Sequence, residues 1–247
     1  MSEQRPDLDT HPQTALVTGA TSGIGRAVAL KLADDGFAVL VHGRDAARGE
    51  QTVEEIVSAG GRARFVAADL GSAVDVQRLV DEAGDVDVLV NNGGFSWFGP
   101  TPELDVDTFD ALFASDVRSA YFLVAGIAPK MAARGGGSII NLSSMAGQIG
   151  LAGGAAYGAT KASLASLTRS WAAEFSPSGV RVNAIAPGPV YTGGSDPALI
   201  ESLGTTTLLN RAAGPEEIAE VIAFLASPKA SYVTGAVVAA DGGRTAV

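Results

Sequence analysis

Residues 14–36 read TALVTGATSGIGRAVALKLADDG, and this stretch indicates the fold. A short apolar run at 14–18 leads into a glycine-rich turn, and the turn leads directly into a segment with helical spacing of apolar residues at 24–35. Glycine lets the backbone approach a phosphate group, and the start of a helix offers free N–H groups and the positive end of its dipole. The order strand, glycine turn, helix therefore favours dinucleotide binding, although a tight connection alone would look similar.

The glycines of this turn depart from the G-x-G-x-x-G pattern, because Gly19, Gly23 and Gly25 give G-x-x-x-G-x-G. We expect the turn to bind the cofactor through Gly19, Thr21, Ser22, Gly23, Ile24 and Gly25.

Along the rest of the chain, short runs rich in Val, Ile and Leu alternate with longer helical patterns, which is typical of a parallel sheet covered by helices. Strands are predicted at 14–18, 37–42, 63–68, 86–91, 138–142, 180–185 and 235–240. Helices are predicted at 24–35, 46–59, 73–83, 107–133, 157–175 and 215–227, and the fourth should bend at Pro129. The expected fold is α/β, with a flexible arm at 1–13 and a single domain with a sheet of about seven parallel strands at 14–247.

Composition restricts the possible functions. The net charge of −10, from 17 basic and 27 acidic residues, argues against a nucleic-acid partner. The chain has no cysteine and two histidines, so we expect no disulfide and no metal site, and a cytoplasmic location fits. No stretch reaches the roughly 18 uninterrupted apolar residues of a membrane span, and residues 1–13 lack the apolar core of a signal peptide, so we expect no membrane association.

A second group of residues lies downstream, where Tyr157 and Lys161 occur in YGATK, thirteen residues after Ser144. Residues at i and i+4 share one face of a helix, so the ammonium can stabilise the phenolate within one pocket and make the tyrosine a usable acid and base. A Tyr and a Lys at this spacing also occur by chance. The glycine turn upstream is what makes a catalytic role for the pair the favoured interpretation. Ser143 competes with Ser144 for a catalytic role, and a serine after a strand is often only a cap.

Six motifs in order make the chain resemble the short-chain dehydrogenase/reductase family from about Thr14 to Gly243. Besides the glycine turn and the Ser-Tyr-Lys set, they are DL at 69–70, VNNGG at 90–94, VRVNAIAPG at 180–188 and SYVTGAVVAADGG at 231–243. GPEEIAE at 214–220 also resembles the 3-oxoacyl-carrier-protein reductases. The resemblance implies a single doubly wound, Rossmann-like domain with a strand order of 3-2-1-4-5-6-7, and a homotetramer assembled through long helices and the C-terminal strand.

The resemblance also implies individual roles. Tyr157 would exchange a proton with the substrate oxygen, Lys161 would bind the nicotinamide ribose, and Ser144 would hold the substrate oxygen as charge develops there. Further cofactor contacts are implied for Asp69, Leu70, Asn92, Gly93, Pro187, Gly188, Val190 and Thr192. Family members usually have Ala at the position of Gly93, and the loss of one methyl group should be tolerated.

The end of the second strand favours NADP(H) over NAD(H). A carboxylate at this place would accept hydrogen bonds from the ribose 2′-hydroxyl of NAD, whereas an arginine can hold the 2′-phosphate of NADP. His42 stands where the carboxylate is expected, and Arg44 follows two residues later. Asp45 could weaken this preference, and Arg44 could be an ordinary solvated loop residue.

Asp116 is a departure from the family pattern within the catalytic set. Family members commonly have Asn before Val in the long fourth helix, where it helps to hold a water next to the catalytic lysine, and this chain has Asp116 and Val117. The carboxylate either reaches the Lys161 region and offsets part of the ammonium charge, or satisfies helix backbone groups as Asn would.

The substrate is the least determined part of the prediction. Phe95, Trp97, Phe98 and Tyr191 are expected to form pocket walls, which favours an apolar or ring-containing compound, although aromatic packing under a lid gives the same pattern. The predicted function is hydride transfer between NADP(H) and a carbonyl or secondary alcohol substrate. A non-catalytic dinucleotide sensor or scaffold is the alternative, and a serine hydrolase is disfavoured because no G-x-S-x-G turn is present.

Overall fold

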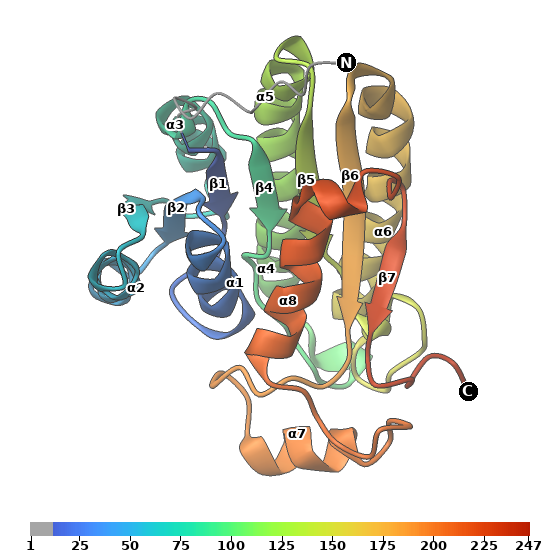
Figure 1. Ribbon diagram of the computed structural model, residues 1–247. Coiled ribbons are helices and arrows are strands. Elements are labelled where there is room, and N and C mark those ends of the chain that lie inside the picture. Colours follow the sequence, from blue (N-terminus) through green and yellow to red (C-terminus); the bar gives the residue numbers. More distant parts are fainter. Residues whose placement is uncertain (1–11) are drawn as a thin grey trace.

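The computed structural model describes residues 12–247, so residues 1–11 of the predicted arm lie outside the described part. Within it, parallel strands form one seven-stranded sheet in the order β3-β2-β1-β4-β5-β6-β7, with helices on both faces (Figure 1). This confirms the predicted doubly wound sheet and its strand order. The carboxyl ends of the strands meet at one edge, which is where ligands bind in open α/β sheets.

The observed elements agree closely with the predicted ones. The strands are β1 (Thr14–Val17), β2 (Ala38–Gly43), β3 (Arg62–Ala67), β4 (Val88–Asn91), β5 (Gly137–Leu142), β6 (Val180–Pro187) and β7 (Val237–Ala240). The helices are α1 (Gly23–Asp34), α2 (Ala46–Ser58), α3 (Ala73–Ala83), α4 (Val106–Phe113), α5 (Ser119–Ala133), α6 (Ala155–Phe175), α7 (Pro197–Gly204) and α8 (Pro215–Ala226). Helix α7 was not predicted, and it lies beyond the carboxyl edge of the sheet (Figure 1).

The predicted helix 107–133 is divided by a π-helical segment, Ala114–Arg118, which separates α4 from α5. The interruption lies well before Pro129, where a bend was expected, and α5 continues through that proline. A π turn widens the helix by one residue per turn and changes which side chains face inward, and such turns are frequent at functional sites. Asp116 lies in this segment and is buried.

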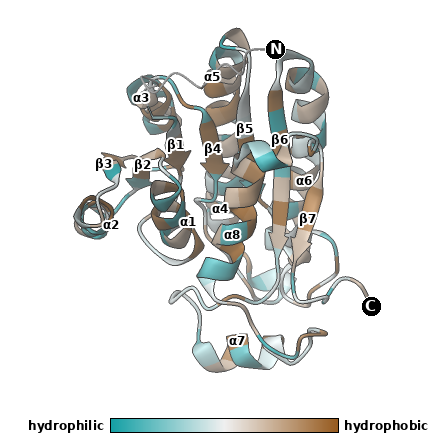
Figure 2. Cartoon of the chain, in the orientation of Figure 1, coloured by the Kyte–Doolittle hydropathy of each residue, from teal (hydrophilic) through white to brown (hydrophobic). Residues whose placement is uncertain are grey.

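Two apolar layers, one on each face of the sheet, form the core. Because successive residues of a strand point to opposite faces, Val17 belongs to the layer under α1 and α8, whereas Leu16 belongs to the layer under α3, α5 and α6. Figure 2 shows the hydrophobic colouring concentrated on the central strands and on the helix faces that cover them. The stretch Val106–Ala133 is long and apolar enough to resemble a membrane span, but 44 % of its apolar window is buried inside the protein, as in a core helix.

Candidate active site

A cavity of about 650 Å³ lies at the carboxyl edge of the sheet. Its volume falls within the range of small-molecule sites, which is about 300–1,000 Å³. It brings together most of the predicted cofactor residues, namely Gly19, Thr21, Ser22, Gly23, Ile24, Gly25, Arg44, Asp69, Leu70, Asn92, Gly93, Tyr157, Lys161 and Thr192. The predicted residues Asp116, Ser144, Pro187, Gly188 and Val190 are not among its lining residues.

The glycine turn leaves no room for side chains. A Cβ at Gly19 would lie 2.8 Å from the Cα of Gly93, and one at Gly25 would overlap with the Asn92 side chain and the Gly19 carbonyl. Thr18 ties the turn to the loop after β4, because its Oγ1 accepts hydrogen bonds of 2.9 Å from the backbone N–H groups of Asn92 and Gly93. The bare backbone at the start of α1 therefore faces the cavity, which is the arrangement that a pyrophosphate requires.

His42 has a structural role that the sequence analysis did not predict. Its ring is buried, with the residue 2 % exposed, and the Gly19 backbone N–H donates to Nδ1 at 3.2 Å. The other nitrogen, Nε2, lies 3.2 Å from the Ala68 carbonyl oxygen and donates to it. Burial lowers the pKa of His42 to about 4, so the ring is neutral at physiological pH. His42 therefore supports the turn from the end of β2, where it also lines the cavity beside Gly43 and Arg44.

The residues after His42 continue the cavity wall. Gly43 lines the cavity without a side chain, and a Cβ at this position would overlap with Cγ2 of Thr21. Arg44 lines the cavity, and so does Arg48 from the first turn of α2, which the sequence analysis did not identify. The Asp45 carboxylate caps α2 by accepting from Arg48 N at 3.1 Å and also accepts from Arg48 Nε at 2.8 Å. The Asp45 carboxylate is therefore already paired with Arg48.

Two other regions that were predicted to bind the cofactor, Asp69 and the loop after β6, also contact neighbouring parts of the protein. Asp69 lines the cavity, but its Oδ1 accepts a 2.9 Å hydrogen bond from Gly71 N, which fixes the turn after β3. Val190 lies in an isolated bridge with Ala213, and Thr192 continues from it to the cavity, within 3.0 Å of a Cβ built on Gly23. These contacts place the loop after β6 against the glycine turn.

Tyr157 and Lys161 lie on α6, and the Lys161 Nζ is 5.4 Å from the centre of the Tyr157 ring. The two serines differ in their contacts. Ser143 is buried and its hydroxyl donates to the Lys161 carbonyl at 2.9 Å, whereas Ser144 is partly exposed and its hydroxyl accepts from Ala146 N at 3.1 Å. The Ser143 proton is therefore engaged, and the Ser144 hydroxyl keeps its proton for another acceptor. These contacts favour Ser144 over Ser143 as the serine that binds the substrate oxygen.

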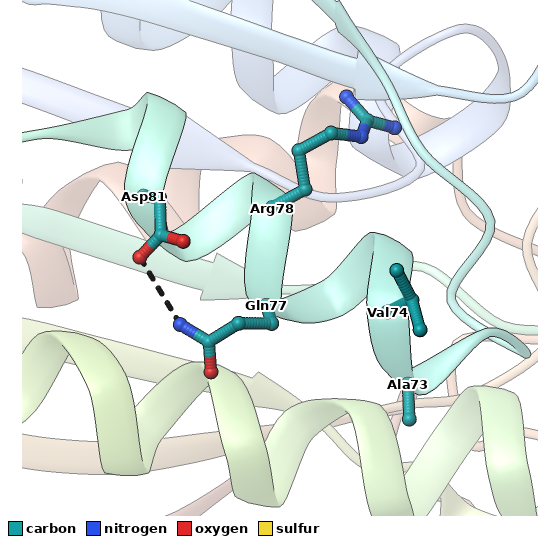
Figure 3. Close-up of a pocket in the computed structure, with 5 residues that line it drawn as sticks. All are labelled: Ala73, Val74, Gln77, Arg78 and Asp81. Carbon is teal, nitrogen blue, oxygen red and sulfur yellow. Dashed lines mark hydrogen bonds between the residues drawn. The ribbon is translucent and has the colours of Figure 1, made fainter.

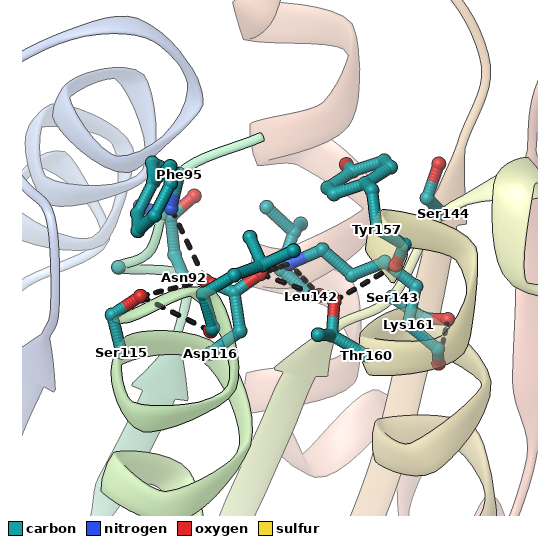
Figure 4. A network of polar contacts seen from close by, with 12 residues as sticks. Asn92, Phe95, Ser115, Asp116, Leu142, Ser143, Ser144, Tyr157, Thr160 and Lys161 are labelled. Atoms are coloured by element: carbon teal, nitrogen blue, oxygen red, sulfur yellow. Dashed lines mark hydrogen bonds and ion pairs between the residues drawn. The ribbon is translucent and has the colours of Figure 1, made fainter. Parts of the chain in front are cut away.

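Asp116 reaches Lys161 directly (Figure 4), with 3.3 Å between its Oδ2 and the Lys161 Nζ. The ammonium also donates to the Leu142 carbonyl at 3.3 Å. The two side chains are 0 % and 7 % exposed. Burial alone would lower the pKa of Lys161, but the Asp116 carboxylate and Tyr157 act in the opposite direction, and the pKa is raised above its usual 10.5. Lys161 is therefore held as an ammonium ion.

The aromatic residues that were predicted as pocket walls lie on the segments after β4 and β6, and Phe95 lines the cavity. Phe98 packs on Tyr157 with ring centres 5.3 Å apart and is 55 % exposed, and Phe95 and Tyr191 are 40 % and 42 % exposed. Trp97 is partly buried beside Gly99. Residues that the sequence analysis did not single out also line the cavity, including Ser96, Ala111, Ser115, Gly193 and Gly194.

The other surface features carry no comparable chemistry. A shallow depression on α3 contains a hydrogen bond of 3.1 Å from the Gln77 amide to Asp81 and none of the predicted site residues (Figure 3). Within residues 12–247, no group of three or more potential metal ligands is present.

Comparison with known proteins identifies the family. A short-chain dehydrogenase family model, described as enoyl-(acyl carrier protein) reductase, matches residues 19–245. The chain belongs to the short-chain dehydrogenase/reductase family. This short-chain dehydrogenase/reductase is 41 % identical to the cis-4-hydroxycyclohexanecarboxylate dehydrogenase of Sinomonas cyclohexanicum, over 95 % of the chain and 97 % of the relative. It is 36 % identical to a 3-oxoacyl-[acyl-carrier-protein] reductase of Staphylococcus aureus, over 94 % and 97 %.

A solved structure supports the same assignment. The angucycline C-6 ketoreductase LanV with bound NADP superimposes on this short-chain dehydrogenase/reductase with a TM-score of 0.90, at 34 % identity, over 95 % of this chain and 96 % of the other. The protein is thus an oxidoreductase with the fold of nicotinamide-dependent enzymes.

Proposed function

We propose that this oxidoreductase reduces a ketone, or oxidises the corresponding secondary alcohol, with NADP(H), and that Tyr157 is its proton donor and acceptor. The observation that carries the proposal is that the bare glycine turn, Tyr157 and a buried ammonium line one cavity. When bound there, the nicotinamide supplies or receives the hydride. The residues that would hold the cofactor are the glycine turn, Arg44, Asn92, Thr192 and Lys161.

The protein's own residues would divide the remaining work. Tyr157 protonates the substrate oxygen in reduction and takes the proton back in oxidation. The Lys161 ammonium favours the phenolate form of Tyr157, because opposite charges attract strongly in a buried site. The Ser144 hydroxyl donates to the substrate oxygen, and this hydrogen bond strengthens as negative charge develops on the oxygen.

The preference for NADP(H) is supported by the wall after β2. Gly43 supplies no carboxylate at the strand end, and Arg44 and Arg48 both line the cavity. Guanidinium groups bind phosphate through charge-assisted, often bidentate hydrogen bonds. No hydrogen bond or ion pair of the Arg44 side chain is present among residues 12–247, so its donors are available for the 2′-phosphate.

The substrate is proposed to be a ring-containing ketone or secondary alcohol. Phe95 lines the same cavity as Tyr157 and is partly exposed, and the exposed Phe98 lies against the Tyr157 ring itself. A relative is named for its activity on a hydroxycyclohexane carboxylate, and a structural neighbour for its reduction of an angucycline. A 3-oxoacyl carrier protein is the second candidate, but the net charge of −10 does not favour an acidic carrier.

Replacement of Phe98 tests the ring preference. Phe98→Ala should raise the KM for cyclohexanone about two- to ten-fold, because an aromatic contact contributes roughly 0.5–1.5 kcal/mol. The KM for 2-hexanone, a linear ketone with the same number of carbons, should change less. Steady-state kinetics with both ketones measure the difference, and equal losses would show that Phe98 only supports the loop.

The assembly is proposed to be a cytoplasmic homotetramer. Phe109, Tyr121 and Phe122 on α4 and α5 are 41 %, 47 % and 53 % exposed, and Phe224 and Tyr232 near the C-terminal strand are also exposed. Two separate apolar faces on one protomer can build a closed tetramer. Light scattering during size-exclusion chromatography should give four times the 24.9 kDa of the chain.

A substrate panel tests the proposed function. We would assay cyclohexanone, 4-oxocyclohexanecarboxylate, a 3-oxoacyl thioester and a linear ketone, each with NADPH and NADH, by absorbance of the reduced nicotinamide. The proposal predicts turnover of a ring ketone with NADPH as the better cofactor. If NADPH binds and no ketone or alcohol is turned over, the protein is a dinucleotide sensor or scaffold instead.

A further inference from the structure

We infer that Asp116 is a built-in counter-ion for Lys161, which fixes the position of the ammonium and sets the pH range in which Tyr157 can work. Asp116 is a positioning residue on this account, because it acts through Lys161. The inference rests on the proposed function of Tyr157. Asn at this position, as is common in the family, would bring no charge to the site.

The burial of both charges is the first support. The Asp116 carboxylate is fully buried and the Lys161 side chain almost fully, and 3.3 Å separates Oδ2 from Nζ. An isolated charge is very costly inside a protein, and removing one partner of a buried pair leaves the other uncompensated. Asp116 and Lys161 thus depend on each other for their charged forms.

The surrounding residues also accommodate and bind the Asp116 carboxylate. Its Oδ1 accepts from Phe95 N at 3.1 Å, and its Oδ2 accepts from Thr160 Oγ1 at 3.3 Å. A Cβ on Gly94 would overlap with Oδ1, so the carboxylate occupies space that only glycine leaves free. The π-helical segment turns residue 116 toward α6 (Figure 4). The loop after β4 and helix α6 therefore both contact this one side chain.

The groups that face the ammonium are few. Asp116 and Tyr157 are the titratable groups that act on the Lys161 charge. From β5, the Leu142 carbonyl accepts from Nζ, and this group does not titrate. Any change in the charge of the site therefore passes through the Asp116, Lys161 and Tyr157 set, whose protonation steps are coupled.

The sign of the effect follows from the charges. The form that is active in alcohol oxidation has a phenolate beside an ammonium, so activity rises with pH as Tyr157 loses its proton and falls when Lys161 loses its own. The Asp116 carboxylate repels the phenolate and holds the Lys161 proton. Both effects move the pH range in which the enzyme oxidises alcohol to higher values than with a neutral residue at position 116.

Asp116→Asn tests the inference through the pH profile of kcat/KM for alcohol oxidation. Both limbs of the profile should shift to lower pH, by about one unit, which is the lower end of the shift that a neighbouring charge produces. Thr160→Val is the matched control, because it removes a hydrogen bond to the carboxylate and keeps the charge, and its limbs should stay within a few tenths of a unit. Unmoved or upward-shifted limbs in Asp116→Asn would overturn the inference.

Thermal stability gives a second readout that does not depend on turnover. Because the folded-state pKa of Lys161 is raised above 10.5, its stabilisation is fully present below that pH and is lost as the pH rises through the folded value. The Tm difference between the wild type and Asp116→Asn should therefore be largest near neutral pH and shrink toward and above pH 10.5. A constant difference would contradict the ion pair.

The two readouts separate the possible failures. If the wild type turns over no substrate but the Tm difference shrinks with pH, the ion pair stands, whereas the proposed function and the pH role of Asp116 both fail. If the wild type is active and neither readout changes as expected, the proposed function stands and the inference fails. Should Asp116→Asn not fold, Asp116→Ser removes the same charge with a smaller side chain, and the same shifts are expected.

Discussion

Tyr157→Phe should lower kcat/KM for carbonyl reduction by about a hundred- to ten-thousand-fold, the range typical for the loss of a general acid. The phenylalanine ring keeps the packing against Phe98, whose ring centre lies 5.3 Å away, so the fold and the cavity should be preserved. Only the exchangeable proton is removed. Initial rates of NADPH consumption measure the loss, and fluorescence titration should show that the affinity for NADPH stays within a few-fold of the wild type.

The control for this prediction is Tyr121→Phe, which removes a phenol from a half-exposed position on α5 that does not line the cavity. This variant should keep wild-type turnover. A purified Tyr157→Phe protein that retained more than a tenth of the wild-type kcat/KM would show that another group delivers the proton.

Arg44→Ala should weaken NADPH binding about ten- to a hundred-fold, because hydrogen bonds between charged groups contribute roughly 1.5–3 kcal/mol. The affinity for NADH should hardly change, since NADH has no 2′-phosphate for Arg44 to hold. Isothermal titration of both cofactors with the wild type and the variant measures the two ratios.

Arg48→Ala is an informative companion, because Asp45 already engages the Nε of Arg48. We expect a smaller loss of NADPH affinity than for Arg44→Ala. Equal losses for NADPH and NADH in the Arg44 variant, or no loss at all, would mean that another part of the cavity sets the cofactor preference.

The sequence predicted those features that depend on local spacing. The glycine turn lies between one strand and one helix, and Tyr157 and Lys161 lie one turn apart on α6, so their relation needs no long-range contact. Ser144 was chosen over Ser143 by spacing alone, and the contacts in the structure are consistent with that choice. The roles of these residues remain predictions until the variants are tested.

The contacts of His42 with Gly19 and Ala68 were not predicted because they depend on tertiary structure. Strand β2 pairs with β1 and β3 and is buried on both faces, so its residues Val39–Gly43 are all buried and show no alternation between apolar and polar side chains. Without that alternation, the sequence does not reveal which residue at the strand end faces the cavity. In the structure, His42, Gly43 and Arg44 all line the cavity.

The π-helical segment and α7 were missed for different reasons. Ala114–Arg118 contains neither proline nor glycine, so nothing local marks the interruption, whereas Pro129 marked a break that α5 does not show. Helix α7 did have a signal, because Asp196 and Pro197 are a capping residue and a favoured first residue of a helix. The direct contact between Asp116 and Lys161 follows from the π-helical segment and could therefore only be offered as one of two possibilities.

Deuterium transfer tests the central claim most directly. The wild-type protein would be incubated with a ring ketone such as cyclohexanone and NADPH that carries deuterium at both C4 positions, and the alcohol product would be analysed by mass spectrometry. The account predicts one deuterium on the carbinol carbon of each product molecule, and no product above background with Tyr157→Phe. Alcohol formed without deuterium, or labelled NADPH that binds and stays unchanged with every ketone offered, would contradict it.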